Sequence, residues 1–278
     1  PDVENLVLDL QEKGACYQAV QGAREVYNLA ADMGGMGFIE NNRALCMLSV
    51  LINTHLLLAA KDVGIERFFY ASSACVYNAD KQRDPNVTAL KEADAYPAMP
   101  EDGYGWEKLF SERMCRHFRE DFGLQTRFAR YHNVYGPHGT WEGGREKAPA
   151  AICRKVIAAK LSGKHEIEIW GDGTARREFM DAADLADAVV RHVLQGHDAP
   201  ELMNIGPGHD HAVNDYYAAA AQVVGWQGRF VHDLSRPVGM RRKLLDVSRQ
   251  AAWGWAPRTG LREGLARSYQ YFLENPRP

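Results

Sequence analysis

The chain has 278 residues, of which 46% are hydrophobic and 25% charged, as is ordinary for a globular protein. Its formal net charge of -3 gives no broad positive surface for a nucleic acid or an anionic membrane, so we expect neither partner, and an acidic ligand has to be bound by local cations. The five cysteines are odd in number and lack Cys-x-x-Cys spacing, so we expect no disulfide framework, no metal site and a reducing, cytoplasmic location.

Short β-rich runs alternate with longer helical patterns along the first half of the chain. Such alternation predicts parallel βαβ units, and hence an α/β fold with a doubly wound, Rossmann-type parallel sheet. The predicted strands are residues 6–8, 25–29, 67–71 and 125–131, and the predicted helices are residues 11–20, 40–63 and 104–121. The apolar run 50–60 is interrupted by polar residues and is too short to span a bilayer.

The pattern loosens after Pro137. Glycine-rich turns at residues 139–144, 170–173 and 206–208 separate shorter elements, as is typical of a region that covers a substrate. We therefore predict a first, Rossmann-type domain over residues 1–137. Residues 138–278 are expected to form a smaller, mainly substrate-binding region, with some elements returning to the Rossmann-type sheet.

A tyrosine and a lysine four residues apart, Tyr104 and Lys108, lie on a predicted helix. That spacing places both side chains on one face, one turn apart. An ammonium near a phenol favours the phenolate and brings its pKa of about 10 toward neutrality, so the pair is a candidate general base. The same spacing also occurs in helices that are merely amphipathic and exposed.

Polar or glycine-rich clusters follow three of the predicted strands, at residues 30–37, 72–75 and 132–133. In an open parallel sheet, ligands bind beyond the carboxyl ends of the strands. The glycines at 34, 35 and 37 allow a backbone to approach a ligand closely, although they also suit a plain flexible turn. Together with Tyr104 and Lys108, these clusters predict a binding site at that edge of the sheet.

These motifs, in this order, resemble the extended short-chain dehydrogenases that act on nucleotide sugars. More closely, three segments are similar to the GDP-mannose 3,5-epimerase family, namely NLAADMGGMGF at residues 28–38, FFYASSAC at 68–75 and GGREKAPAAICR at 143–154. Related dehydratases and 4-epimerases share the tyrosine, lysine and serine. They normally lack the equivalents of Cys75 and Lys147.

The resemblance implies NAD as cofactor and a GDP-mannose-like nucleotide sugar as substrate. Tyr104, supported by Lys108, would take the proton of the hydroxyl at sugar carbon 4 while a hydride passes to NAD. The ketone formed would acidify carbons 3 and 5, where Cys75 and Lys147 would act as the acid/base pair. Ser73 would hydrogen-bond the reacting sugar. A homodimer formed through a helical bundle is common in this family.

The other residues that the resemblance implies divide between the two ligands. For the cofactor they are Asp9, Leu10 and Ala30, besides Tyr104 and Lys108. For the substrate they are Gly34, Ala74, Asn133, Glu146, Ala148, Lys155 and Arg241, besides Ser73, Cys75 and Lys147. Lys155 and Arg241 are candidates for the two phosphates.

The front of the chain departs from the family pattern. The usual first strand, the glycine-rich turn that receives the NAD pyrophosphate and the second strand have no counterpart before residues 7–10, which match the family's third strand. In that strand Asp9 would face the adenine, and the resemblance implies a truncated NAD-binding domain over residues 1–137. Two interpretations stay open: a truncated sheet completed from elsewhere, or residues 1–10 pairing with the strand 25–29. A non-catalytic sugar-nucleotide-binding module and a related NAD-dependent dehydratase or 4-epimerase are the alternative functions.

Overall fold

The computed structural model describes residues 3–82, 89–143, 145–195, 198–236 and 241–275; Gly144, Gly239 and Met240, which belong to motifs named above, lie outside these ranges. The chain forms two compact units. The first comprises Pro1–Asn78, Ala95–Arg130 and Val189–Met203, and the second comprises Ala79–Asp94, Tyr131–Ala188 and Asn204–Pro278. The predicted functional division at residues 137 and 138 stays a prediction.

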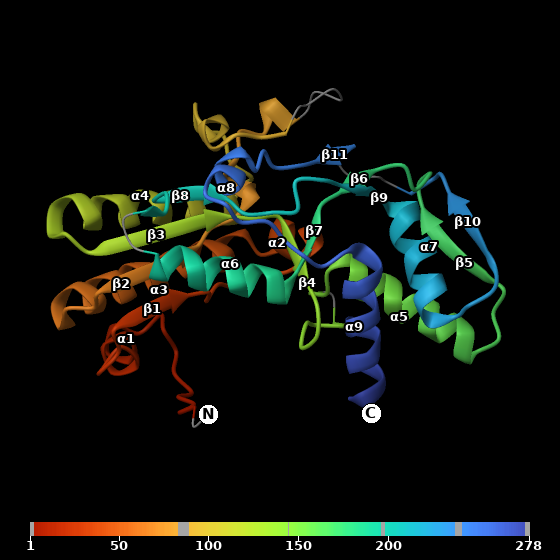
Figure 1. The fold of residues 1–278 in the computed structure, drawn as a ribbon, viewed down its shortest axis with the longest axis horizontal. Helices are drawn as coiled ribbons and strands as arrows, with labels where there is room; N and C mark the ends of the chain where they lie inside the picture. The colour runs from red at the N-terminus through yellow and green to blue at the C-terminus, as the bar shows by residue number, and fades with distance from the viewer. Residues whose placement is uncertain (1–2, 83–88, 144, 196–197, 237–240, 276–278) are drawn as a thin grey trace. The chain divides into compact units, whose positions relative to one another are not determined.

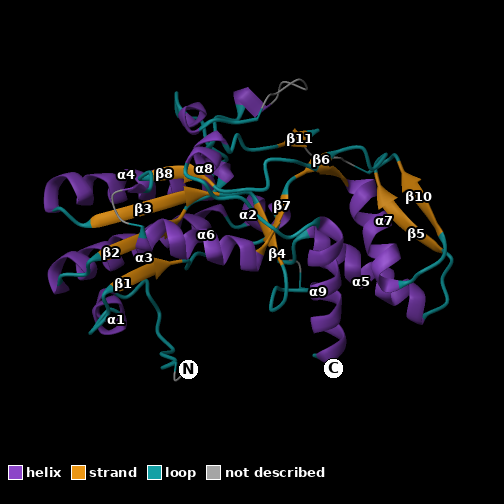
Figure 2. Ribbon diagram, viewed as in Figure 1, coloured by secondary structure: helices purple, strands orange, loops and turns teal. Residues whose placement is uncertain are grey.

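The first unit is built on a four-stranded sheet in the order β1-β2-β3-β8. β1 pairs with β2 and β2 with β3, both in parallel, so that Arg67 lies between Glu25 and Gln125. The three arrows run side by side in one direction in Figure 2. The predicted parallel, doubly wound α/β sheet is therefore confirmed. The strands are β1 (Glu25–Asn28), β2 (Arg67–Ala71), β3 (Gln125–Arg130) and β8 (Leu202–Asn204).

Helices cover this sheet. The predicted helix over residues 40–63 is divided at Asn42, whose side-chain amide donates to the carbonyl of Phe38 and so satisfies the end of the shorter helix. The long helix ends at Gly64, where φ is 76°, a value that favours glycine. The helices are α1 (Lys13–Ala19), α2 (Met36–Asn41), α3 (Arg43–Val63) and α4 (Tyr104–Phe122).

α3 is the one helix in the described ranges that is long and apolar enough to cross a bilayer by length and composition. α3 extends beyond both ends of the apolar run 50–60. Its inner face belongs to the core of the first unit, where Leu56, Leu57 and Ala60 pack with Phe68 and Phe128 from the sheet. A core helix passes the same test of length and composition, and the buried face explains the apolar residues.

The predicted strand over residues 6–8 is wrong. Residues 3–9 form no strand, Leu6 is 45% exposed and Val7 fully exposed, and the segment runs away from β1 in Figure 1. A short apolar alternation becomes a strand only when a neighbour satisfies its backbone groups. In the described ranges, β1 pairs with β2 alone, so residues 3–9 do not repack against it.

The described part of the second unit contains three small sheets. β4 (Asn133–Tyr135) pairs with β7 (Phe179–Asp181), and β5 (Glu166–Trp170) pairs with β10 (Arg229–Asp233), in parallel. The third sheet has the order β11-β6-β9. Its strands are β6 (Arg176–Arg177), β9 (His211–Ala212) and β11 (Arg242–Lys243).

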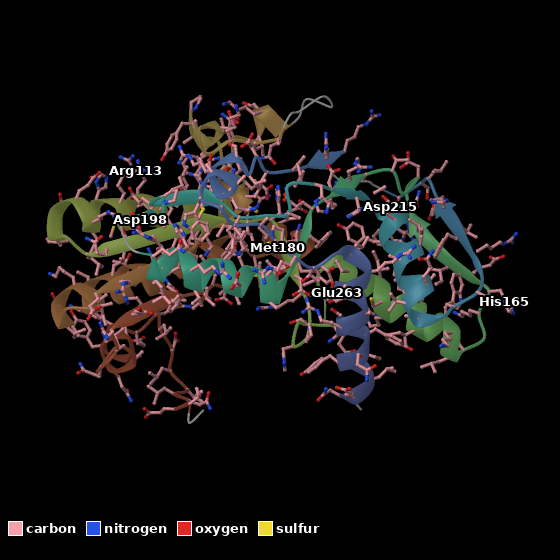
Figure 3. The ribbon with its side chains drawn as sticks, in the orientation of Figure 1. Arg113, His165, Met180, Asp198, Asp215 and Glu263 are labelled. Carbon is pink, nitrogen blue, oxygen red and sulfur yellow. The ribbon has the colours of Figure 1, made fainter. Side chains whose placement is uncertain are left out.

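Three helices pack around one hydrophobic core in the second unit. Val156, Ala220 and Leu265 from three different helices are almost completely buried there, together with Ile169 of β5. Met180 of β7, labelled in Figure 3, is 3% exposed. The helices are α5 (Ala148–Leu161), α7 (Val213–Val224), α8 (Ser248–Ala252) and α9 (Leu261–Glu274), while α6 (Ala182–Leu194) has residues in both units. Among the described residues, the structure also has the short 3-10 helices η1 (Ala74–Val76), η2 (Asp80–Gln82) and η3 (Glu92–Ala95).

Candidate active site

Tyr104 and Lys108 lie in the first two turns of α4, on one side of the helix, as the spacing predicts. Lys108 Nζ is 5.4 Å from the centroid of the Tyr104 ring and 4.7 Å from that of the Tyr70 ring on β2. Tyr104 is 6% exposed and Lys108 is 2% exposed. The two side chains thus form a compact, largely dry pair beside the sheet.

An acidic neighbour faces the buried ammonium. Glu107 Oε2 is 3.6 Å from Lys108 Nζ, and both side chains are nearly inaccessible to solvent. Burial lowers the pKa of Lys108 from its usual value, because a charge is costly away from water, while the carboxylate of Glu107 opposes that shift. An ammonium has three N–H donors, more than one carboxylate oxygen takes, so Lys108 can also donate to a ligand; its role toward a cofactor stays a prediction.

The segment after β2 brings Ser73, Ala74 and Cys75 to the start of α4. Ser73 Oγ accepts a hydrogen bond of 3.2 Å from the Cys75 amide and caps η1. Cys75 packs against a buried cluster that includes Tyr104 and Cys46. Three residues predicted for catalysis, Ser73, Cys75 and Tyr104, are therefore brought together within the first unit.

The segment after β1 is shaped by backbone contacts. The amide of Ala30 donates to Asn28 Oδ1 at 3.2 Å, and that of Asp32 donates to Ser49 Oγ on α3 at 3.0 Å. Gly34 is buried so closely that an added Cβ would lie 2.8 Å from Phe38 Cβ. Close packing, rather than a plain flexible turn, accounts for this glycine.

Asp9 and Leu10 lie in the turn that leads into α1. Asp9 accepts a hydrogen bond of 2.9 Å from the Gln11 amide, and the Leu10 carbonyl accepts one from Cys16 Sγ at 3.1 Å. The strand expected to carry Asp9 is absent, as described above. Their role toward a cofactor stays a prediction.

The second unit holds the remaining predicted residues. Asn133 begins β4 opposite Phe179 on β7. Glu146 forms an ion pair of 2.9 Å with Arg154, one of the residues on α5. Lys147 and Ala148 lie at the N-terminus of α5, as its N-cap and its first residue. Lys155, two turns further on, lies 3.4 Å from Tyr217 Oη and 5.9 Å from the centroid of the Trp170 ring.

The three-stranded sheet carries a strip of cations near Arg241. Arg176 and Arg242 are paired across the strands and both bind Asp210, Arg176 at 2.6 Å. Arg177 and Lys243 form the next pair, and since side chains alternate along a strand they point to the opposite face. Burial lowers the pKa of Arg177, as expected of a cation poorly solvated.

Two buried groups lie close to Arg177 and Lys243. Burial and these two cations lower the pKa of His132 to about 3. Burial also raises the pKa of Glu178 to about 8, although its carboxylate accepts the amides of Gly208 and Leu245 at 3.2 and 3.1 Å. Both shifts favour the uncharged forms of His132 and Glu178 near pH 7.

The sequence analysis missed Glu107, Arg177 and Lys243. Glu107 precedes Lys108 directly in the sequence, which could have indicated an acidic partner for the lysine. Neighbouring residues on a helix, however, do not normally face each other. Arg177 and Lys243 lie far apart in the sequence and become neighbours only through the pairing of β6 with β11. No local pattern carries that information.

Comparison with known proteins agrees with this geometry. The model of the NAD dependent epimerase/dehydratase family matches residues 2–206. GDP-mannose 3,5-epimerase from Arabidopsis thaliana is 41% identical over 272 residues, which cover 96% of this chain and 70% of that protein. GDP-L-colitose synthase from Yersinia pseudotuberculosis is 34% identical over 96% of this chain and 87% of its own.

Solved structures show the same fold. UDP-glucose 4-epimerase from Thermotoga maritima, in complex with UDP-glucose, superposes with a TM-score of 0.82 at 22% identity, over 96% of this chain and 83% of that chain. The parallel sheet and the Tyr104–Lys108 pair thus define a Rossmann-type enzyme of the short-chain dehydrogenase/reductase class, with NAD as cofactor. Within that class, the chain belongs to the NAD dependent epimerase/dehydratase family.

Proposed function

We propose that the chain epimerises a GDP-sugar, converting GDP-mannose to GDP-L-galactose by transient oxidation at carbon 4 and inversion at carbons 3 and 5. One observation carries the proposal: Cys75, whose thiol is proposed to transfer protons, packs against the buried cluster of Ile39, Cys46 and Tyr104, the first residue of α4. Simple oxidation and reduction at carbon 4 need the tyrosine but no second acid. The 41% identity to GDP-mannose 3,5-epimerase supports the same substrate.

Each residue has a distinct task in this proposal. Tyr104 takes the proton of the carbon 4 hydroxyl and later returns it, and the Lys108 ammonium stabilises the phenolate meanwhile. NAD, when bound, supplies the redox chemistry by accepting a hydride and giving it back. Cys75 and Lys147 remove and deliver protons at carbons 3 and 5, which are acidic while carbon 4 is a ketone.

Cations of the second unit are proposed to bind the diphosphate. Arg241 and Lys155 are joined by Arg177 and Lys243, whose strands β6 and β11 are paired. Charge-assisted bonds to phosphate are about twice as strong as neutral ones and provide a local attraction that a net charge of -3 does not. Asn133, Glu146 and Ala148 are proposed to line the sugar side of the site, with Gly34 and Ser73.

Two further properties belong to the proposal. The protein is a homodimer, supported by exposed apolar side chains one turn apart on two packed helices, Met47 and Leu51 on α3 and Trp106 and Phe110 on α4. It acts in the cytoplasm, supported by five free cysteines.

The deciding experiment follows proton exchange at the sugar. The protein is incubated with NAD and GDP-mannose in deuterated water, and deuterium at carbons 3 and 5 is measured by NMR. Intact protein is expected to exchange both positions. Cys75→Ser and Lys147→Ala are expected to lose most of that exchange while still forming NADH. Serine is a far weaker acid than a thiol, whose pKa is near 8.5, and alanine has no proton to transfer.

Two results would contradict the proposal. NADH formation without exchange at either carbon in the intact protein would make it a simpler oxidoreductase, such as a 4-epimerase. Binding of GDP-mannose without any NADH would make it a non-catalytic binding module. Tight binding of NAD is checked beforehand by mass spectrometry of the ligands released from the purified protein.

A further inference from the structure

Glu107 and Lys108 are adjacent in α4, yet their charged ends meet. Successive residues of a helix point about 100° apart, so helix geometry alone does not bring such neighbours together. Here the distance from Glu107 Oε2 to Lys108 Nζ is 3.6 Å. An additional set of contacts must hold the carboxylate on this side of the helix.

Two hydroxyl groups provide those contacts. Tyr70 Oη on β2 donates to Glu107 Oε1 at 2.8 Å, and Ser111 Oγ, one turn along α4, donates to the same oxygen at 2.9 Å. All three residues are almost completely buried. The first oxygen is thereby fixed, and the second is aimed at the lysine.

The second oxygen of the Glu107 carboxylate lies opposite the Lys108 ammonium. Within the part of the chain that the structure describes, Glu107 Oε2 is buried and accepts no hydrogen bond. Leaving a buried carboxylate oxygen without a hydrogen bond costs about 1–3 kcal/mol or more, so the position of this oxygen opposite an ammonium has to be explained. Lys108 needs a counter-charge, because a buried ammonium without one tends to lose its proton.

We propose that Glu107 is a positioning residue, which keeps Lys108 charged and in place beside Tyr104 through an anchor formed by Tyr70 and Ser111. The inference rests on the proposed function, in which Lys108 must carry its charge to stabilise the phenolate. The other titratable groups that face Lys108 are Tyr104 and Cys115 on α4, Tyr70 on β2 and Cys75 after β2. Glu107 is the one carboxylate among these groups, and it is the acidic partner of the Lys108 ammonium.

The test measures the titration of Lys108 directly, without substrate. Lysine labelled with ¹³C at Cε is incorporated into the whole chain, and the Lys108 signal is assigned by its loss in Lys108→Arg. The midpoint of the Lys108 titration is then measured by NMR. Glu107→Gln is expected to lower that midpoint by at least about one pH unit. Asp121→Asn, which removes an exposed carboxylate from the same helix, is the matched control and is expected to leave the midpoint unchanged.

A second variant keeps the Glu107 carboxylate and removes the two hydroxyl groups that anchor it. Tyr70→Phe combined with Ser111→Ala is expected to lower the midpoint by about half a pH unit. It also serves if Glu107→Gln does not fold. An unchanged midpoint in folded Glu107→Gln or in the double variant, or an equal shift in Asp121→Asn, would overturn the proposal.

The proposed function is judged by a different measurement. If it holds, loss of NADH formation on the alkaline side is expected to move to lower pH in Glu107→Gln, since Lys108 then loses its charge earlier. If intact protein forms no NADH with GDP-mannose, the proposed function fails while the NMR titration still decides the role of Glu107.

Discussion

Gly105 and Cys75 are in direct contact through their backbones. A Cβ added to Gly105 would lie 2.3 Å from the carbonyl oxygen of Cys75, a distance that no real side chain tolerates. The same carbonyl accepts the Glu101 amide at 2.9 Å. Glu101 in the segment before α4 and Gly105, the second residue of α4, therefore hold Cys75 at the start of that helix.

Gly105→Ala is expected to displace Cys75 and to lower the free energy of unfolding by about 1–3 kcal/mol, the usual cost of overpacking. Deuterium exchange into the sugar should fall more than NADH formation, because Tyr104 stays on its helix. Urea unfolding and the exchange assay provide the two measurements. Gly14→Ala in α1, where an added Cβ meets nothing within 4 Å, is the control and should stabilise the protein slightly. Equal stability in the two variants would show that the contact is unimportant.

Tyr104→Phe is expected to abolish NADH formation and to leave binding of the nucleotide sugar nearly unchanged, since it deletes only the proton acceptor. Tyr104 is buried and its ring is kept in the variant, so the fold should survive. Rapid-mixing absorbance at 340 nm and calorimetry measure the two properties. Undiminished turnover would remove Tyr104 from the mechanism.

Arg241→Ala and Arg177→Ala are each expected to weaken binding of a GDP-sugar by about 1.5–3 kcal/mol, the typical contribution of one charge-assisted contact. Both residues lie at the strip of cations on β6 and β11. Arg113→Ala, which removes an exposed arginine from α4, is the matched control (Figure 3). Calorimetry that finds equal affinities in all three variants would exclude a role of the strip in phosphate binding.

Glu178 is expected to make stability depend on pH. Its pKa is raised from 4.5 to about 8 in the folded state, so between these values the folded chain binds more protons than the unfolded one. The free energy of unfolding should therefore fall as pH rises, by about 1.4 kcal/mol between pH 7 and pH 9. His132 and His192 have pKa values lowered from 6.5, to about 3 and about 4, so they stay neutral in that window.

The measurement is urea unfolding at several pH values. Glu178→Gln should show a flatter profile, because it has no proton to lose. Its absolute stability is expected to be lower at pH 7, since an amide in place of the carboxyl gives up one of the two hydrogen bonds from Gly208 and Leu245. A slope as large in Glu178→Gln as in the unaltered protein would assign the pH dependence to another group.

Phe110→Glu is expected to shift the protein from dimer to monomer. Phe110 is 50% exposed on α4, and a charge there would have to be buried in an apolar interface. Sedimentation equilibrium gives the mass. Phe122→Glu, at a 56% exposed site at the other end of the helix, is the control. A dimer of equal affinity in both variants would place the interface elsewhere.

The sequence by itself determined the features that depend on local spacing. A separation of four residues on a helix puts Tyr104 and Lys108 together whatever surrounds them, and the distances agree. Alternation of β-rich and helical segments predicted the parallel sheet, with the strand at residues 67–71 placed to the residue. The motifs around Cys75 and Lys147 also sufficed to indicate the family, because they combine residue types that the shared chemistry does not require.

Only the tertiary structure decided what depends on partners distant in sequence. Residues 6–8 resemble a strand but remain outside the sheet, since no strand among the described residues satisfies their backbone. Glu107 turns toward Lys108 because Tyr70, which lies 37 residues earlier in the sequence, holds its other oxygen. Arg177 and Lys243 meet through strand pairing. Burial and long-range contacts set the charge of such groups, and neither is written in local sequence.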